Sequence, residues 1–189
     1  MTKFMFAAAV AATLAATPAF AAGEVLSIDL DRVLSESTAA KNGTNQLKAK
    51  YDSQISARRT TFNTAAQTYQ TQLNTARAAV KPGVQPAPAT VQAVQQAGEK
   101  AQQAQDSLNQ LGQELQSVEG YVRQQIIDKL TPIAEQVRNE RKAGAVLPKG
   151  AVFAVDPSND VTAVVIQRLD ASFPNPSITL PQAPAGQGR

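Results

Sequence analysis

Two long stretches of the chain repeat their apolar positions with the period of a helix. In the first, apolar or small residues and one arginine recur at a mean spacing of about 3.67, close to an eleven-residue helical repeat. This first stripe consists of Leu47, Tyr51, Ile55, Arg58, Phe62, Ala66, Tyr69, Leu73, Ala76 and Val80. In the second, steps of three and four alternate as in a coiled coil, at Val94, Ala97, Ala101, Ala104, Leu108, Leu111, Leu115, Val118 and Val122. We therefore predict two helices of roughly 40 residues, or about 60 Å each.

The segment between the stripes, residues 81–90, reads KPGVQPAPAT. It is either a linker between two domains or the turn of a helical hairpin. Each stripe is narrow and the rest of each helix is polar, so each helix needs a partner to bury its apolar side. Because neither flank has a core of its own, the partner is the other helix, and residues 81–90 form a hairpin tip. Lys81-Pro82 ends the first helix, and Thr90 is expected to cap the second.

Short apolar runs near the two ends of the chain predict a small sheet. Residues 25–28, 145–147 and 151–155 read as strands, and a Pro-Lys-Gly turn separates the last two. Asp29 and Asp160 are expected to cap the helices that follow them. Three short strands leave open edges and little apolar face, so we expect the sheet to oligomerise. The candidate interface residues are Val25, Leu26, Ile28, Val146, Leu147, Val152, Phe153 and Val155.

The predicted fold is mostly α with a small β body. A long antiparallel coiled-coil hairpin arm projects from a short-stranded sheet that oligomerises. Residues 22–173 form a single domain, in which residues 37–142 are the arm, with its tip at 81–90, and residues 22–36 and 143–173 are the body. Residues 174–189 are rich in proline and glycine, and we expect them to be disordered.

The first 21 residues have the pattern of a secretory signal peptide: a lysine, an apolar run and an Ala-x-Ala site that ends at Ala21. A membrane anchor is the weaker alternative, because the run is shorter than the roughly 20 apolar residues of a span. A lipid anchor would need a cysteine, and the chain has none. We expect cleavage after Ala21 and a periplasmic location.

The composition argues against most catalytic chemistry. The chain has no histidine, cysteine or tryptophan, so the commonest general base, metal ligand and nucleophile pairs are missing. Asp29 and Asp31 could ligate a metal, but acids are also favoured at a helix start. The loop that begins at Asp156 has the first spacings of a calcium loop without its glycine or final glutamate. We therefore expect no enzyme, no metal, no cofactor and no nucleic-acid partner.

The charge of the chain is unevenly distributed. Without Lys3 there are 17 basic and 15 acidic residues, yet the first long helix has Asp52 as its only acid between Lys41 and Lys81. The basic residues of this stretch are Lys41, Lys48, Lys50, Arg58, Arg59, Arg77 and Lys81. Such a helix either presents a solvated face or attracts an anionic partner, and both interpretations stay open.

Aromatic residues on the first stripe have two interpretations. They either pack between the two helices or line an inner surface that touches extended polypeptides. Long arms with scattered apolar contacts and basic charge would bind such chains weakly at many points, with affinity built by multivalency. The candidate client-binding residues are Tyr51, Ile55, Arg58, Arg59, Phe62, Tyr69, Leu73, Arg77 and Lys81.

The sequence VLSIDLDRVLSESTAAK, residues 25–41, resembles the opening strand and helix of the Skp/OmpH family of periplasmic chaperones. The sequence VLPKGAVFAVDPSNDVTAVVIQRL, residues 146–169, resembles the closing strands and last helix of that family. Pro132 falls where the family has a proline in its descending helix, and is therefore a candidate hinge of the arm. The arms of this chain are richer in Gln, Ala and Thr, and the extension after Phe173 is additional.

The resemblance implies a homotrimer in which the strands form a central barrel and three arms enclose a cavity. It also implies an ATP-independent holdase for unfolded outer-membrane proteins, with affinity for lipopolysaccharide or anionic lipid in some members. The alternative is a structural or adaptor hairpin protein of the cell envelope, whose tip docks on a partner. Such adaptors have further β-domains around the hairpin, and the predicted elements leave few residues to build them.

Overall fold

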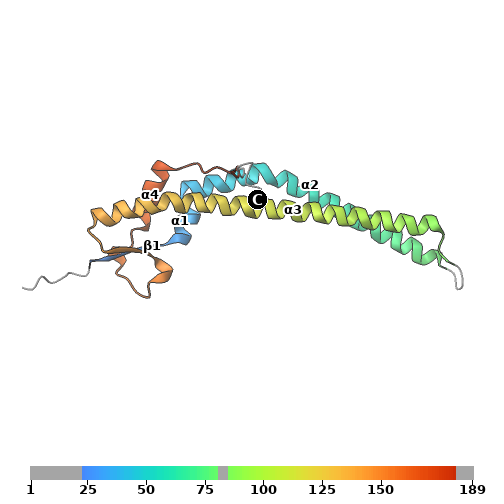
Figure 1. Cartoon of the computed structure of the whole chain (residues 1–189), viewed down its shortest axis with the longest axis horizontal. Coiled ribbons are helices and arrows are strands. Elements are labelled where there is room, and N and C mark those ends of the chain that lie inside the picture. The colour runs from blue at the N-terminus through green and yellow to red at the C-terminus, as the bar shows by residue number, and fades with distance from the viewer. Residues whose placement is uncertain (1–22, 81–84, 182–189) are drawn as a thin grey trace, which may run out of the picture.

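The protein is a long helical rod with a small body at one end (Figure 1). The computed structural model describes residues 23–80 and 85–181, so the predicted signal peptide, Ala21 and Lys81 lie outside the described residues. The described elements are β1 (Val25–Ile28), α1 (Leu30–Glu36), α2 (Thr38–Ala79), α3 (Pro88–Glu140), β2 (Ala145–Pro148), 3-10 turns at Lys149–Ala151 and Pro157–Asn159, and α4 (Thr162–Ser172). The predicted fold class is confirmed: the protein is mostly helical, with a small sheet.

The arm consists of α2 and α3, which lie antiparallel from the body to the tip (Figure 1). Buried residues of α3 fall seven positions apart, at Ala97, Ala104, Leu111 and Val118, which is the predicted heptad spacing. On α2, no residue beyond Tyr51 is buried. The buried residues of the seam thus change from large side chains near the body to alanine in the outer arm. No helix in the described ranges has a window apolar enough to cross a membrane.

The second arm helix begins three residues earlier than predicted. We expected Thr90 as its cap, but α3 begins at Pro88, with Ala87 in the cap position. Proline suits the first helical position because its fixed φ is already helical and its missing N–H would have had no partner there. Pro132 lies inside α3, which continues through it without interruption. Its role as a hinge stays a prediction.

The core of the body forms where β1, α1, α4 and the C-terminal part of α3 meet. Leu26, Val33, Val165 and Leu169 expose none of their surface, and they pack in one cluster with Ile126 and other apolar residues of α3. Burying such side chains is worth about 1.5–3 kcal/mol each. This cluster anchors the arm on the body.

The predicted acidic caps hold the short helices of the body in place. The Asp29 side chain accepts a hydrogen bond from the backbone N–H of Arg32, at 3.1 Å, and caps α1 as predicted. Val161 occupies the cap position of α4, where we expected Asp160. The Asp160 carboxylate still accepts from the N–H of Thr162 at 3.0 Å, so it satisfies a free donor of this helix from one residue further back.

The sheet has two strands where we predicted three. β1 and β2 are parallel, with Val25 opposite Ala145 and Ile28 opposite Pro148. Residues 151–155 are not a strand, because the 3-10 turn at Lys149–Ala151 directs them away from β2. They form the orange loop beside β1 in Figure 1 and pair with no strand among residues 23–80 and 85–181.

The segment after α4 is ordered on the arm where we expected disorder. Residues 174–181, here called the strap, run from α4 along α2 and α3 (Figure 1). Pro176 is buried, and Ile178 packs against the core of the body and against the seam of the arm. Side-chain amides of the arm donate hydrogen bonds to backbone carbonyl oxygens of the strap. These bonds explain why a proline-rich segment is fixed here. Residues 182–189 lie outside the described part of the chain.

Candidate functional site

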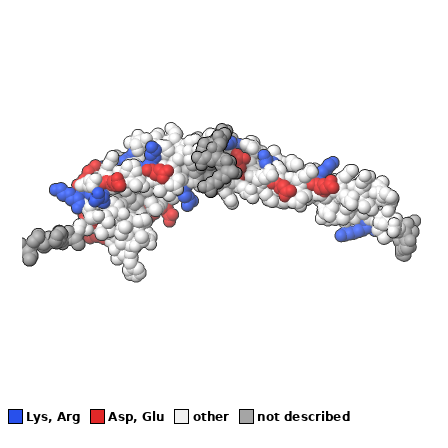
Figure 2. Space-filling view, in the orientation of Figure 1, with Lys and Arg blue, Asp and Glu red and all other residues white. Residues whose placement is uncertain are grey.

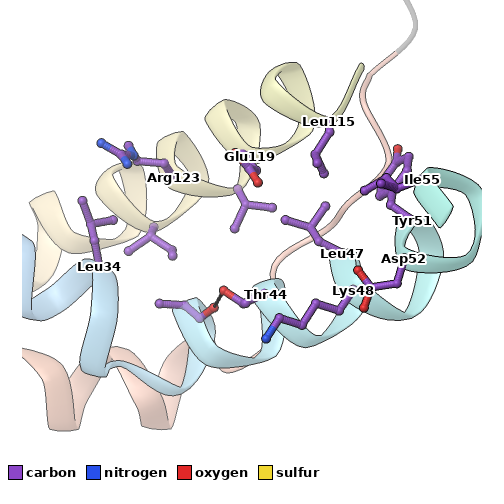
Figure 3. A pocket seen from close by; sticks show the side chains of 13 residues that line it. Leu34, Thr44, Leu47, Lys48, Tyr51, Asp52, Ile55, Leu115, Glu119 and Arg123 are labelled. Atoms are coloured by element: carbon purple, nitrogen blue, oxygen red, sulfur yellow. Dashed lines mark hydrogen bonds between the residues drawn. The ribbon is translucent and has the colours of Figure 1, made fainter. Parts of the chain in front are cut away.

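An open cleft lies between α2 and α3 where the arm joins the body (Figure 3). Its volume is about 350 Å³. The side chains of Leu47 and Leu115 extend from opposite helices into this space (Figure 3). The apolar residues that line the cleft are Leu34, Ala40, Leu47, Tyr51, Ile55, Leu115, Val122 and Ile126.

Charged side chains of both signs also line the cleft. Lys48 and Asp52 come from α2, and Glu119 and Arg123 come from α3. On each helix the two charges are four residues apart and therefore lie one turn apart on the same side. None of the four is in an ion pair with another described residue. The cleft can therefore accept an apolar group that has a charge of either sign beside it.

Tyr51 belongs to the seam of the arm. Its side chain is 1% exposed, and its hydroxyl donates a hydrogen bond to Glu114 Oε1 at 2.7 Å. Lys50 Nζ lies 4.7 Å from the centre of the Tyr51 ring and 3.8 Å from Glu114 Oε1. The interaction with the Tyr51 hydroxyl raises the pKa of Lys50, and the negative charge of Glu114 adds to this effect. At Tyr51 the packing interpretation therefore holds, and a client could touch this ring only if the arm opened.

The other apolar members of the first stripe keep part of their surface exposed. Ile55, Phe62, Tyr69 and Leu73 are all half-buried. Tyr69 lies against α3, since a Cβ atom added to Gly98 would be 3.3 Å from Tyr69 Cε2. All four side chains keep an open edge, so they stay candidate client contacts.

The basic surface of α2 is smaller than the residue count suggests. Arg58 turns into the seam, where Nη1 donates to the carbonyl oxygen of Ser107 at 2.7 Å and to its hydroxyl at 3.2 Å. This contact explains a charged residue on the apolar stripe. Arg59 and Arg77 are exposed. On the face drawn in Figure 2, acidic and basic groups are interspersed along the rod and do not form a patch of one sign.

The outer arm is almost uncharged. From Thr60 to Gly98 the only charged residues are Arg77 and Lys81. A shallow groove of about 680 Å³ follows the two helices there, lined by Thr60, Thr61, Thr64, Ala65, Thr68, Ala97, Lys100, Gln103, Ala104 and Ser107. Near the tip, a pocket of about 260 Å³ is lined mainly by apolar groups, including Leu73, Val80, Pro86, Val91 and Val94. The arm thus has several shallow surfaces along its length.

The candidate interface residues of the body fall into three groups by exposure. Leu26 and Ile28 are buried within their own chain, and Val146, Val152 and Val155 are half-buried. Val25, Leu147 and Phe153 are exposed, and the side chain of Phe153 is in full contact with solvent. An apolar pocket of about 310 Å³ between α3 and β2 extends to Leu147. The sheet end of the body therefore presents apolar surface, and its role as an interface stays a prediction.

Sequence reasoning missed the α3 side of the cleft and the strap. Leu115 stands in the second stripe, and Glu119 and Arg123 each directly follow a seam residue. Charged residues that directly follow members of the apolar stripe are therefore the sequence signal for this side of the cleft. The strap is held through its backbone and through two apolar side chains, so no periodic pattern marks it in the sequence.

Comparisons with known proteins agree on the family. The family model described as outer membrane protein (OmpH-like) matches residues 24–169. A crystal structure described as an OmpH-like outer membrane chaperone from Caulobacter crescentus CB15 superposes with a TM-score of 0.61 at 18% identity, over 93% of this chain and 95% of the Caulobacter chain. At this identity the superposition shows a shared fold. No curated protein gives a significant match. Because the family model spans most of the chain, the protein belongs to the OmpH-like family.

Proposed function

We propose that this protein is an ATP-independent holdase chaperone of the periplasm. It binds unfolded outer-membrane proteins and keeps them soluble for delivery to the outer membrane. Membership of the OmpH-like family supports a chaperone role. The observation that carries the finer proposal is the cleft between α2 and α3, where an apolar lining is combined with Lys48, Asp52, Glu119 and Arg123.

Client capture follows from the size and spacing of the surfaces along the arm. The cleft, the outer groove and the tip pocket are each small and open. No single surface of this size gives tight binding, but an unfolded chain can occupy several of them together, and linkage raises the overall affinity. Each contact breaks quickly on its own, so the client can be released without nucleotide hydrolysis. The chain acts as a binding protein and not as an enzyme.

The protein acts as a homotrimer, with several arms around one client. The exposed Leu147 and Phe153 at the sheet end support this part of the proposal, because an oligomer that packs through this end would remove their apolar surface from water. Val152→Asp with Phe153→Asp should dissociate the oligomer, since a buried unpaired charge is costly. Light scattering that finds the unmutated protein to be a folded monomer would contradict the oligomer.

The test of the holdase is the refolding of a urea-denatured outer-membrane barrel by dilution, without nucleotide. Aggregation, followed by light scattering, should fall when the protein is present. Ile55→Gln with Leu115→Gln removes apolar surface from the cleft and should weaken this protection. Val164→Gln is the matched control, because Val164 is 36% exposed on α4 and lines neither the cleft, the outer groove nor the tip pocket. Unchanged aggregation with the wild-type protein would contradict the proposal, and an equal loss of protection with Val164→Gln would remove the cleft from client binding.

A further inference from the structure

Helix α2 holds the strap through side-chain amides that contact the backbone of the strap. Asn42 Nδ2 donates a hydrogen bond to the carbonyl oxygen of Pro174 at 3.0 Å. One turn further along the helix, Gln46 Nε2 donates to the carbonyl oxygen of Pro176 at 3.3 Å. Both of these bonds end on main-chain atoms and are available to any extended segment, while Asn42 Nδ2 also donates to the side-chain oxygen of Asn175 at 3.0 Å.

Helix α3 completes the contact from the other side with a single amide. Gln125 Nε2 donates to the carbonyl oxygen of Ser177 at 2.8 Å, and Gln125 Oε1 accepts from the Ser177 N–H at 3.0 Å. This pair of bonds copies the contact that a neighbouring strand would make. The strap therefore lies in a groove that binds the main chain of an extended segment from both helices.

Two positions of this groove select side chains. At Gly43 the helix has no side chain, and an added Cβ would lie 3.2 Å from Pro176 Cγ and 2.8 Å from Val122 Cγ1. Pro176 fits into the resulting notch and is buried. Two residues later, Ile178 packs between the core of the body and the seam cluster around Tyr51. The groove thus favours a proline followed two positions later by a branched aliphatic residue.

We propose that this groove is a binding site for an extended polypeptide segment of that pattern, and that the strap fills it until a client displaces it. The proposal deepens the proposed holdase function and rests on it. The strap is uncharged, and Thr179 and Leu180 are exposed, so a few hydrogen bonds and the packing of two apolar side chains hold it, with Asn175 bonded to Asn42. Val122 lies beside the notch and also lines the cleft, so a client in the cleft is next to the groove.

The test measures whether the groove accepts a segment from another molecule. A fluorescent peptide with the sequence of residues 173–181 is titrated into two full-length proteins, the wild type and a strap-release variant, Pro176→Asp with Ile178→Asp. The variant should bind the peptide about tenfold more tightly, because the wild-type groove is already occupied. Adding Gln125→Leu to the variant should weaken binding about fivefold through the loss of two hydrogen bonds. A peptide with the same two aspartates is the control.

Circular dichroism and sedimentation establish first that the three proteins share one fold and assembly. Equal binding of the peptide by the wild type and the strap-release variant, or no binding by either, would overturn the proposal, because the strap contacts would then serve folding alone. The aggregation assay with the same proteins separates the two proposals. Wild-type protein that fails to suppress aggregation counts against the holdase, whereas peptide binding tests the groove whatever that assay shows.

Discussion

The inner and outer halves of the arm share one sequence pattern but bury different amounts of apolar surface. Near the body, Leu47, Tyr51, Leu111 and Val118 form a buried cluster. Farther out, the only buried residues of α3 are alanines at 97 and 104, and α2 has none beyond Tyr51. Hydrophobic period therefore sets which helices pair, while the size of the side chains sets how tightly they pair.

This difference suits the proposed holdase, which would hold unlike chains. Regions with few buried apolar contacts open locally at a low free-energy cost. We therefore infer that the outer arm adapts its shape around a client while the inner arm and body stay fixed. The two halves of the arm also differ in charge. The outer arm is almost uncharged, whereas the cleft of the inner arm has charges of both signs.

The largest effect is expected from a matched pair of leucines. Leu169 is fully buried in the body, and Leu169→Ala should lower the free energy of unfolding by about 3 kcal/mol. Leu73 is half-buried in the outer arm, and Leu73→Ala should cost less than about 1 kcal/mol. Urea unfolding at one fixed protein concentration measures both. Equal losses would show that the outer arm is as tightly packed as the body.

Glycines of the arm give a second comparison. Gly43→Ala should destabilise the protein by about 1–2 kcal/mol, because the new methyl group would be forced against Val122 and Pro176. Gly112 and Gly120 have no neighbour within 4 Å of an added Cβ, so alanine there should stabilise α3 by up to about 1 kcal/mol each. Melting temperatures of the three variants test this, and a Gly43→Ala protein as stable as the wild type would contradict the close contact with the strap.

Neighbouring arginines separate packing from client attraction. Arg58→Gln should cost about 1 kcal/mol of stability through the lost bonds to Ser107, while Arg59→Gln should leave stability nearly unchanged. Arg59→Gln with Arg77→Gln should instead slow the association of an acidic unfolded client at low salt, and the difference should shrink at high salt. Stopped-flow association at two salt concentrations measures this. Identical, salt-independent rates for both proteins would remove the exposed arginines from client capture.

The smallest effect concerns acid stability of the body. Hydrogen bonds from the hydroxyl and N–H of Thr162, with a further contribution from Lys149, hold the pKa of Asp160 below its ordinary value of 3.8. A carboxylate with a lowered pKa adds stability that is complete above the ordinary value and is lost as the pH falls through the lowered one. Asp160→Asn should therefore cost under about 1 kcal/mol at neutral pH and nothing in strong acid. Thermal unfolding of both proteins from strong acid to neutral pH measures this difference in stability. A difference that does not change with pH would refute the linkage.

The sequence was sufficient for the features that depend on period and on proline. The stripes on both sides of residues 81–90 predicted the pairing of the two long helices, and the blocks at both ends predicted the small sheet and the family. The third strand was wrong because an apolar run becomes a strand only where a partner edge is available. The strap was missed because its partners are side-chain amides far away in sequence, and the contact of Arg58 because its partner is a backbone carbonyl.

Hydrogen exchange of the intact protein, with and without an unfolded outer-membrane protein, tests most directly whether the arm holds the client. In the free protein, amides of residues 60–79 and 88–104 should exchange faster than those of residues 118–137. With the client, exchange should slow at residues 44–55 and 115–126 around the cleft, and along the outer arm. Slower exchange confined to the body, with the arm unchanged, would contradict capture by the arm.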